Sequence, residues 1–341
     1  MVWIQKDGRR SSPSCDKDGR ERGERRPTAT GNTDIGDITP DQLIAQIAEW
    51  RGHEVRYETL AGAITNHNYL VTVDGEPGSP GAGKFVLRIP GKGTDTFIDR
   101  ECEQHNQLAA AAAGVSPPVL YLIEPGYCRV VPFIEGETLH PATIAGHPDR
   151  LRLVVEAIRT YHDKAVFENE VRVFDLIRDD ARKGRELDAP QPYQIEWMLW
   201  VGQRIERALQ RDEPAAVACH GNLLSENFLL GPEGRLWVID WEHSGTADPY
   251  FDLGSLCVEH PLSASEEESV LATYCGSPEE RRYARMMLYK LIVDLRWSLW
   301  AMIQCKVSKL EFDFYQYGLD RIARFCDNAA HSDLETWLKQ A

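Results

Sequence analysis

Strand-like segments are concentrated in the first part of the 341-residue chain, and long amphipathic helical segments fill most of the rest. The segments 54–60 ("EVRYETL"), 68–73 ("NYLVTV") and 84–90 ("KFVLRIP") are rich in β-branched and aromatic residues. The segments 148–165 and 194–212 instead carry Leu, Ile, Val and Trp at helical spacing. Strands followed by helices predict an α+β fold in which a β-rich part precedes a mainly helical part.

The length and the order of the segments predict two lobes, because 341 residues exceed the usual size of one hydrophobic core. We expect residues 35–135 to form a small β-rich lobe with one internal helix, which the Ala-rich segment 94–114 predicts. Residues 136–341 are expected to form a larger, mainly helical lobe. Residues 1–34 are rich in Arg, Gly and Ser and poor in large apolar side chains, which predicts a disordered tail.

The net charge and the composition argue against nucleic-acid and membrane partners. The formal net charge of −15 argues against nucleic acid or an anionic membrane surface, because both require a basic face, and it favours small cationic molecules. The chain contains no apolar run of the roughly twenty residues that span a bilayer, so we expect no integral membrane segment. The eight cysteines are scattered without a C-x-x-C pair, which indicates reduced thiols of a cytoplasmic protein.

The segment 78–85, "GSPGAGKF", matches the phosphate-loop pattern G-x-x-x-x-G-K but has Phe85 where that pattern requires Ser or Thr. A phosphate loop lies between a strand and a helix, whose first amides bind the phosphate. Here a strand-like segment follows the glycines, so we interpret 78–85 as part of a hairpin turn.

The segment 220–242 carries the strongest chemical signal. It is expected to form a loop, a strand ("FLL"), a turn ("GPEG") and a second strand ("RLWVID"). Such a hairpin brings Asn227 and Asp240 side by side, and strand alternation puts Glu242 on the same side as Asp240. An amide oxygen and two carboxylates are ligands that Mg²⁺ prefers. The alternative is that Asp240 and Glu242 only terminate a strand and face solvent.

Two motifs, 220–230 ("HGNLLSENFLL") and 238–256 ("VIDWEHSGTADPYFDLGSL"), resemble the catalytic and metal-binding loops of the choline/ethanolamine kinase family, especially its bacterial LicA-type members. The resemblance extends upstream to "GAITNHNYLV" and downstream to "RWSLWAMIQCKVSKLEFDFYQYG", and it covers about residues 40–325. It implies a bilobal protein-kinase-like fold of the aminoglycoside-phosphotransferase type. The implied activity is transfer of the γ-phosphate of ATP, with Mg²⁺, to the hydroxyl of choline or a related amino alcohol.

The resemblance also assigns residues to the nucleotide. Arg88 takes the place of the strand cation that contacts the phosphates, and Glu101 takes the place of the acid that anchors this cation. Each could instead be an ordinary surface charge of a strand or a helix. The implied nucleotide-binding residues are Thr65, Asn66, Arg88, Glu101, Val131 and Phe133, where the first two belong to a loop over the phosphates and the last two to a hinge beside adenine.

The remaining implied residues belong to the metal site and the catalytic loop. Asn227, Asp240 and Glu242 would bind Mg²⁺, His220 would order the catalytic loop, and Asp252 would brace it by hydrogen bonds. Asn222 occupies the place where the family has the aspartate that accepts or orients the substrate hydroxyl. A carboxamide cannot take up the proton, so we expect retained nucleotide binding with slow turnover.

Asn222 leaves alternatives open. It is consistent with a natural loss of catalysis, with an engineered inactivation, or with an active variant that tolerates the amide, and Glu226 is a conceivable substitute base. A non-catalytic pseudokinase that binds nucleotide or choline is therefore the alternative to an enzyme.

The implied substrate site lies in the last third of the chain. Trp297 and Trp300 are three residues apart on a predicted helix and share a face, and Phe312 and Tyr317 follow. Aromatic faces attract quaternary ammonium groups, and Glu259 would add a negative charge nearby. The alternatives are that these tryptophans only pack the core, or that the protein phosphorylates another amine such as an aminoglycoside. We expect choline first and ethanolamine second.

Overall fold

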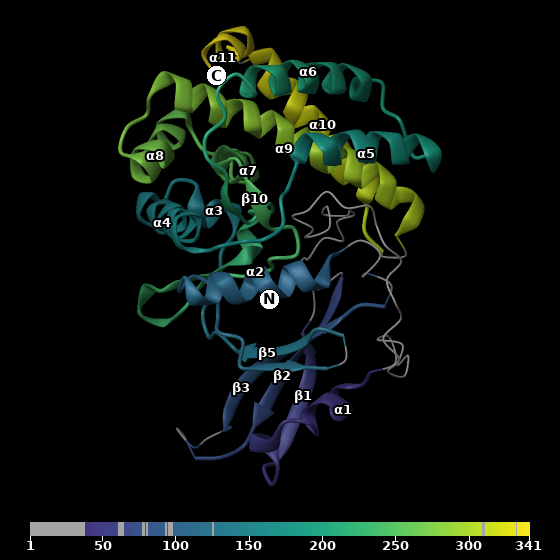
Figure 1. The fold of residues 1–341 in the computed structure, drawn as a ribbon, viewed down its shortest axis with the longest axis vertical. Coiled ribbons are helices and arrows are strands. Elements are labelled where there is room, and N and C mark those ends of the chain that lie inside the picture. Colours follow the sequence, from purple (N-terminus) through teal and green to yellow (C-terminus); the bar gives the residue numbers. More distant parts are fainter. Residues whose placement is uncertain are drawn as a thin grey trace.

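The computed structural model describes residues 38–341 except 61–64, 77–78, 80, 93, 95–97, 125, 309–310 and 332. The expected tail at residues 1–34 lies outside the described residues. The elements form two lobes, with the strands β1–β5 below and most of the helices above, as Figure 1 shows. The expected bilobal α+β fold is confirmed.

The smaller lobe is built on a five-stranded antiparallel sheet with the order β1-β2-β3-β5-β4. A short helix precedes the sheet, and the side chain of Thr39 caps it in a capping box with Gln42. These elements are α1 (Pro40–Ile44), η2 (Ala48–Trp50), β1 (Val55–Leu60), β2 (Asn66–Val73), β3 (Gly83–Pro90), β4 (Tyr121–Ile123) and β5 (Cys128–Pro132).

The glycine-rich segment joins two strands of this sheet. β2 and β3 pair antiparallel with Val73 opposite Gly83, so the two strands form a hairpin. Among the described residues of the connection none is helical, and β3 follows directly. The interpretation of the segment as a hairpin turn is confirmed.

In the described part of the smaller lobe, α2 (Arg100–Ala112) is the one long helix, and it lies between the sheet and the helical lobe in Figure 1. The side chain of Asp99 accepts a hydrogen bond from the backbone N–H of Cys102 at 3.0 Å and caps the helix. The helix ends before Gly114, which has φ of 86° as expected for a glycine after a helix.

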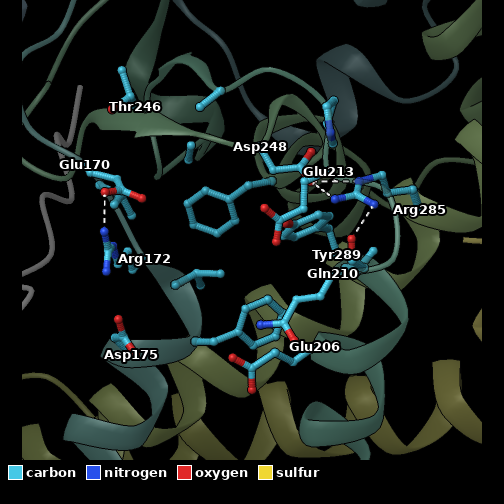
Figure 2. Close-up of a pocket in the computed structure, with 18 of the residues that line it drawn as sticks. Glu170, Arg172, Asp175, Glu206, Gln210, Glu213, Thr246, Asp248, Arg285 and Tyr289 are labelled. Carbon is cyan, nitrogen blue, oxygen red and sulfur yellow. Dashed lines mark hydrogen bonds and ion pairs between the residues drawn. The ribbon is translucent and has the colours of Figure 1, made fainter.

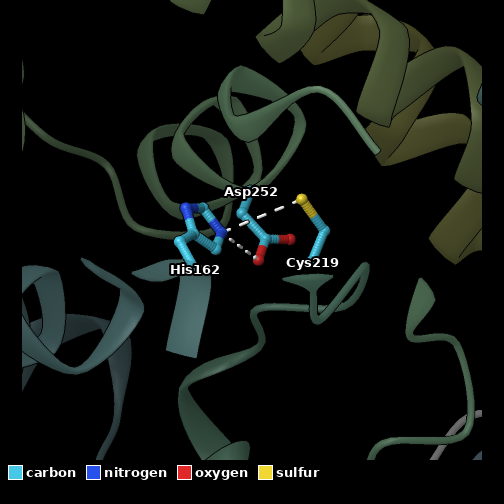
Figure 3. A group of neighbouring side chains, drawn as sticks. All are labelled: His162, Cys219 and Asp252. Atoms are coloured by element: carbon cyan, nitrogen blue, oxygen red, sulfur yellow. Dashed lines mark hydrogen bonds and ion pairs between the residues drawn. The ribbon is translucent and has the colours of Figure 1, made fainter. Parts of the chain in front are cut away.

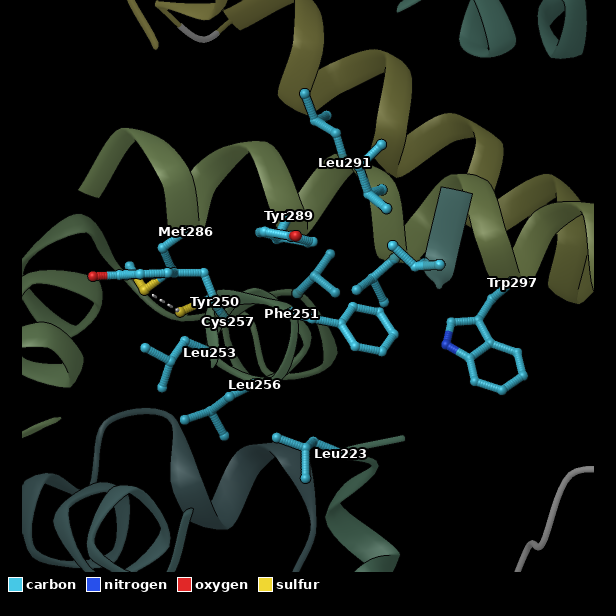
Figure 4. Packing of buried hydrophobic residues seen from close by; sticks show 14 of the residues in the cluster. Leu223, Tyr250, Phe251, Leu253, Leu256, Cys257, Met286, Tyr289, Leu291 and Trp297 are labelled. Carbon is cyan, nitrogen blue, oxygen red and sulfur yellow. Dashed lines mark hydrogen bonds between the residues drawn. The ribbon is translucent and has the colours of Figure 1, made fainter. Parts of the chain in front are cut away.

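The larger lobe is organised around α9, which is buried over most of its length because other helices surround it. Helices α5, α6, α7, α10 and α11 pack against α9 and form the core of this lobe. In Figure 4, Leu253 and Leu256 of α7 lie beneath Met286, Tyr289 and Leu291 of α9. The helices are α3 (Pro141–Ile144), α4 (Pro148–Lys164), α5 (Val173–Glu186), α6 (Gln194–Leu209), α7 (Pro249–Glu259), α8 (Ala264–Cys275), α9 (Glu280–Val307), α10 (Phe314–His331) and α11 (Leu334–Gln340).

Two small sheets in the larger lobe hold the loops of the predicted catalytic and metal-binding residues. One has the strand order β6-β8-β9 and the other pairs β10 with β7. Their bounds are β6 (Glu137–Thr138), β7 (Val217–Cys219), β8 (Phe228–Leu230), β9 (Leu236–Val238) and β10 (Gly245–Ala247). Since β5 ends at Pro132 and β6 pairs with β8, the chain crosses between the lobes just before β6. The expected division at residues 135 and 136 stays a prediction. Within the described residues, no helix is long and apolar enough to cross a membrane.

Candidate active site

The β8–β9 hairpin brings the expected metal ligands to one end. Phe228 pairs with Val238, the turn contains η5 (Pro232–Gly234), and η4 (Ser225–Asn227) precedes β8. Beyond the strands, the backbone N–H of Ile239 donates to the carbonyl oxygen of Asn227 at 3.0 Å. Asn227 and Asp240 therefore lie at the same end, and the predicted hairpin is confirmed.

Three carboxylates meet at this end. Oxygens of Glu103, Asp240 and Glu242 all lie within 4.8 Å of one another, so Asp240 and Glu242 share one side as predicted and α2 adds a third acid. Asp240 has φ of 71°, a backbone conformation that is rare for residues other than glycine and is often found at functional sites. The two acids are buried rather than facing solvent, so the alternative of a solvated strand end is wrong.

This donor set fits a hard divalent cation. Oε1 of Glu242 is buried and makes no hydrogen bond, which is costly for a carboxylate unless a cation satisfies it. Nδ2 of Asn227 donates to the backbone oxygen of Asn222 at 2.9 Å, which leaves the amide oxygen on the other side of the side chain. The assignment of Asn227, Asp240 and Glu242 as the Mg²⁺ ligands stays a prediction.

Arg88 of β3 lies among the same acids. Its Nη2 is 2.7 Å from Oε1 of Glu103, 3.2 Å from Oδ1 of Asp240 and 3.5 Å from Oε2 of Glu242. Burial alone would lower the pKa of the Arg88 guanidinium, but the three carboxylates raise it overall. Burial, together with repulsion from Asp240, raises the pKa of the Glu242 carboxyl well above its ordinary value. Arg88 therefore stays charged, whereas burial and the neighbouring acid work against the charged form of Glu242.

The acid that anchors Arg88 is Glu103, and the prediction of Glu101 is wrong. Glu101 is exposed on α2, whereas Glu103 is 2 % exposed and also pairs with Arg100 at 2.6 Å and with Arg129 of β5. Burial alone would raise the pKa of the Glu103 carboxyl, but the guanidinium groups of Arg129, Arg88 and Arg100 hold it well below its ordinary value. Glu103 is therefore charged and pairs with cations from three segments.

Thr65 and Asn66 lie against the metal-site acids. Oγ1 of Thr65 donates to Oε2 of Glu242 at 2.9 Å, and Nδ2 of Asn66 donates to Oγ1 of Thr65 at 2.8 Å. The neighbouring residues 61–64 lie outside the described residues. A role of this segment over the phosphates of ATP stays a prediction.

A cleft between the lobes leads to Arg88 and Asp240. It encloses about 760 Å³, part of it open to solvent, and Val131 and Phe133 line it as expected for residues beside an adenine ring. Its walls come from both lobes: Leu60, Asn68, Val86, Arg88, Gln107, Pro117, Arg129, Val131, Pro132, Phe133, Ile134, Gly136, Leu229, Ile239 and Asp240. A planar apolar group in this cleft would have charged groups at one end.

The loop that precedes η4 is held by Asp252 of α7. Its carboxylate accepts hydrogen bonds from the backbone N–H groups of His220 at 2.8 Å and Gly221 at 2.9 Å, so the predicted bracing is confirmed. Gly221 has φ of 78°, and a Cβ there would lie 2.5 Å from the carbonyl oxygen of His243, so only glycine fits.

His220 orders the same loop from within. Its Nε2 donates to the carbonyl oxygen of Ile239 at 2.9 Å, and its Nδ1 accepts from the backbone N–H of Asn222 at 3.3 Å. This pair of bonds requires the neutral ring, and burial accordingly lowers the pKa of His220. His220 therefore ties the loop to the strand that leads to Asp240.

Two side chains of α4, Tyr161 and His162, also hold the carboxylate of Asp252 in place. Asp252 also accepts from the hydroxyl of Tyr161 at 2.6 Å and from Nε2 of His162 at 3.2 Å, and Cys219 lies next to His162 (Figure 3). His162, Cys219 and Asp252 have the composition of a metal site, but burial raises the pKa of the Cys219 thiol well above its ordinary value. The thiol donates to the carbonyl oxygens of Ala247 and Asp248 instead. The group is a hydrogen-bonded support for the loop.

Asn222 lies at the centre of these contacts. It is 2 % exposed, and its backbone is bonded on both sides, to His220 and to Asn227. The loop thus fixes the backbone of Asn222, the residue at the position where the resemblance implies an aspartate.

The four predicted aromatic residues form one cluster at the junction of α9 and α10. Ring centroids are 5.6 Å apart for Trp297 and Trp300, 6.2 Å for Trp300 and Tyr317, and 6.0 Å for Phe312 and Tyr317. The ring of His243, which follows Glu242, lies 5.3 Å from Trp297 and links the cluster to the metal site. Trp300 is fully buried, so in this conformation its ring packs against other rings.

Glu259 lies near the aromatic cluster, and its charge is paired with an arginine. Both of its oxygens accept from Arg321, at 2.6 and 2.9 Å, and Arg321 also donates to the hydroxyl of Tyr317 at 2.5 Å. The charge of Glu259 is therefore balanced within the protein. Its distance in sequence from Arg321 explains why the motif alone could not predict this pair.

A second pocket lies on another part of the larger lobe, between α5, α6 and α9 (Figure 2). Its arginines are paired: Arg172 with Glu170, Arg285 with Asp248, and Arg178 with Asp175 and Glu206. With Glu213 it carries more acids than cations, which makes it a poor site for phosphates. The cleft with Arg88 is the better candidate for a nucleotide.

The comparisons with known proteins agree with this geometry. The model of the phosphotransferase enzyme family matches residues 56–289. A solved choline/ethanolamine kinase family protein from Mesorhizobium loti is 30% identical, with a TM-score of 0.76, and the match covers 88% of this chain and 96% of that chain. The chain belongs to the choline/ethanolamine kinase family of phosphotransferases.

Other members of the family show the same extent of similarity. Ethanolamine kinase 2 of Mus musculus is 27% identical over 322 residues, which are 85% of this chain and 81% of the mouse protein. The protein in a crystal structure of LicA in complex with AMP has 26% sequence identity to this chain. The two structures have a TM-score of 0.66, and the match covers 85% of this chain and 96% of that chain. These kinases span nearly the whole described part of the chain.

Proposed function

We propose that this protein transfers the γ-phosphate of ATP to the hydroxyl group of a small amino alcohol and that it uses Mg²⁺. The observation that carries the proposal is the position of Arg88 at the end of the interlobe cleft, anchored by Glu103 and facing Asp240 and Glu242. A fixed cation beside buried carboxylates that fit a divalent metal is the arrangement that phosphoryl transfer requires.

Each group has a defined task in the proposed reaction. Val131 and Phe133 contact the adenine in the cleft, and Arg88 binds the phosphates. Asn227, Asp240 and Glu242 hold Mg²⁺, which supplies charge neutralisation for the transferred phosphoryl group. His220 and Asp252 are positioning residues, because they fix the loop that presents Asn222 to the acceptor hydroxyl.

The amide of Asn222 slows the reaction without preventing it. A positioned general base contributes about 10²–10⁴-fold, whereas alignment and electrostatic stabilisation come from groups that this protein retains. Asn222 can orient the hydroxyl through its side-chain oxygen but cannot accept the proton. The same residue favours a second candidate function, a pseudokinase that binds nucleotide and amine without turnover.

The amino-alcohol acceptor is supported by the aromatic cluster of Trp297, Trp300, Phe312 and Tyr317, which His243 connects to the metal site. Aromatic rings attract an ammonium group through their quadrupoles. Choline is the preferred acceptor in this proposal and ethanolamine the second. The described cysteines are free thiols, which fits a cytoplasmic enzyme that draws on cellular ATP.

The test is ADP release in the presence of ATP and Mg²⁺, with choline or ethanolamine as the acceptor. We expect slow acceptor-dependent release from the protein with Asn222 and a rise of about 10²–10⁴-fold in Asn222→Asp. Glu226→Gln serves as the matched variant, because it lowers the residual rate only if Glu226 acts as a substitute base.

The outcomes separate the two candidates. Nucleotide binding without turnover in the protein with Asn222, with turnover restored in Asn222→Asp, would identify a pseudokinase. If Asn222→Asp shows no rise with any amino alcohol, the proposed acceptor chemistry is wrong.

A further inference from the structure

Asn106 is a fully buried polar residue on α2, one turn after Glu103 and on the same face of the helix. Glu103 points to the guanidinium groups of the smaller lobe, as described above. Asn106 points instead to the larger lobe. α2 therefore contacts both lobes through Glu103 and Asn106, which lie one turn apart on one face of the helix. It lies between the lobes in Figure 1.

The amide of Asn106 reaches two separate segments of the larger lobe. Its Nδ2 lies 2.8 Å from Oδ1 of Asn169, 3.0 Å from Oγ of Ser244 and 3.2 Å from the carbonyl oxygen of Ser244. Two amide hydrogens are thus shared among three buried acceptors. Ser244 comes two residues after Glu242, so these hydrogen bonds attach α2 to the segment that carries the metal-site acids.

The larger lobe provides a rigid anchor at this point. Nδ2 of Asn169 donates to the carbonyl oxygen of Ser244 at 2.7 Å, and the backbone oxygen of Asn169 accepts from both N and Oγ1 of Thr246 at 2.8 Å. A Cβ on Gly245 would lie 2.6 Å from Nδ2 of Asn169, so the two segments pack without space for a side chain. Asn106 is therefore bonded to two segments that are hydrogen-bonded to each other.

We propose that Asn106 is a positioning residue that locks α2 to the larger lobe and thereby sets the Arg88–Glu103 ion pair opposite Asp240 and Glu242 before the nucleotide arrives. Because α2 carries Glu103, a shift of α2 away from Ser244 moves the anchor of Arg88 away from the metal site. The lock removes the need to reorganise the ion pair on binding. This inference rests on the proposed function, since it assigns a task within the same nucleotide site.

The proposal differs from a purely structural role in what it predicts for binding. Asn106→Leu keeps the side-chain size and removes the hydrogen bonds to Asn169 and Ser244. We expect the affinity for Mg²⁺–ADP to fall by about tenfold or more and the KM for ATP to rise in parallel, with the KM for the amino alcohol changed less. Leu108→Ala is the control, because Leu108 lies on the same helix but is 39 % exposed.

A covalent replacement of the lock separates positioning from loss of stability. In the double variant Asn106→Cys, Ser244→Cys, the two new thiols replace side chains that are hydrogen-bonded to each other, and mass spectrometry after oxidation establishes whether they have joined in a disulfide. We expect weak Mg²⁺–ADP binding in the reduced form and binding close to that of the natural protein in the oxidised form. The natural sequence under the same oxidant controls for its own thiols.

The results distinguish the two levels of the account. If the natural protein binds no Mg²⁺–ADP, the proposed function has failed. If the natural protein binds but Asn106→Leu and the reduced double variant bind equally well, the lock is wrong and the proposed function stands. If both variants bind weakly and oxidation restores nothing although the disulfide has formed, Asn106 acts on stability alone and the positioning role is rejected.

Discussion

Arg88, Arg100 and Arg129 share the carboxylate of Glu103, so this one acid balances three guanidinium groups of the candidate site. Burial lowers the pKa of Arg129 to about 10, an effect that Glu103 offsets only in part. Removing the negative charge would leave three guanidinium groups close together with little water. The cost of such a loss is therefore larger than that of an exposed ion pair.

Glu103→Gln and Glu101→Gln make the prediction at the residue scale. We expect Glu103→Gln to lower the free energy of unfolding by about 3–5 kcal/mol and to weaken Mg²⁺–ATP binding, because a buried charge loses its partner. Glu101→Gln, two positions earlier and exposed, should change both quantities little. Denaturant unfolding and nucleotide titration measure the two effects. Equal effects of the two substitutions would contradict the assignment of Glu103.

The choice between Glu101 and Glu103 shows where sequence patterns stop being informative. The one leucine of α2, Leu108, lies seven positions after Glu101 and so on the same face, yet it is 39 % exposed. The buried face carries Glu103, Asn106 and Gln107, which are polar. Periodicity assumes that the buried face is apolar. A helix that is buried by ion pairs and amide contacts between lobes violates that assumption.

At the scale of elements, the β8–β9 hairpin was predictable because the residues that determine it are close together in the sequence. Its turn residues, its two short apolar strands and the acids after them all lie within one stretch of the chain. The ion pair of Glu259 with Arg321 joins α7 to α10 and has no local signal. The contacts of Asn106 with Asn169 and Ser244 likewise join distant segments, so only the folded structure reveals them.

The packing of α7 on α9 gives a prediction at the element scale, since α7 carries Asp252. A Cβ on Gly254 would lie 2.6 Å from Cβ of Tyr289 and 2.9 Å from the backbone nitrogen of Lys290, atoms that cannot move away. We expect Gly254→Ala to lower the melting temperature, with a loss of about 1–3 kcal/mol, and to slow turnover by displacing Asp252.

Gly184→Ala is the matched control in α5. There the nearest atom to the new Cβ is Nε2 of Gln191 at 3.4 Å, and the helix gains from the replacement of glycine. We expect no loss of stability, or a gain of up to about 1 kcal/mol. A Gly254→Ala variant as stable as Gly184→Ala would show that α7 is free to shift.

At the scale of the whole molecule, each lobe has its own hydrophobic core, and the interlobe cleft lies where polar side chains from both lobes meet. The two-lobe plan followed from the order of strands and helices, because element type is decided largely by local composition. The relative placement of the lobes was not predictable, because it depends on buried polar contacts between segments far apart in sequence. The candidate site is formed by that placement.

The central claim is that this cleft binds a nucleotide together with a divalent metal, and a titration of ATP with and without Mg²⁺ tests it most directly. We expect Mg²⁺ to strengthen ATP binding, and Asp240→Asn to remove most of that gain while Asp175→Asn, an exposed acid of the second pocket, leaves it unchanged. ATP binding that is the same with and without Mg²⁺, and the same in Asp240→Asn, would contradict the account.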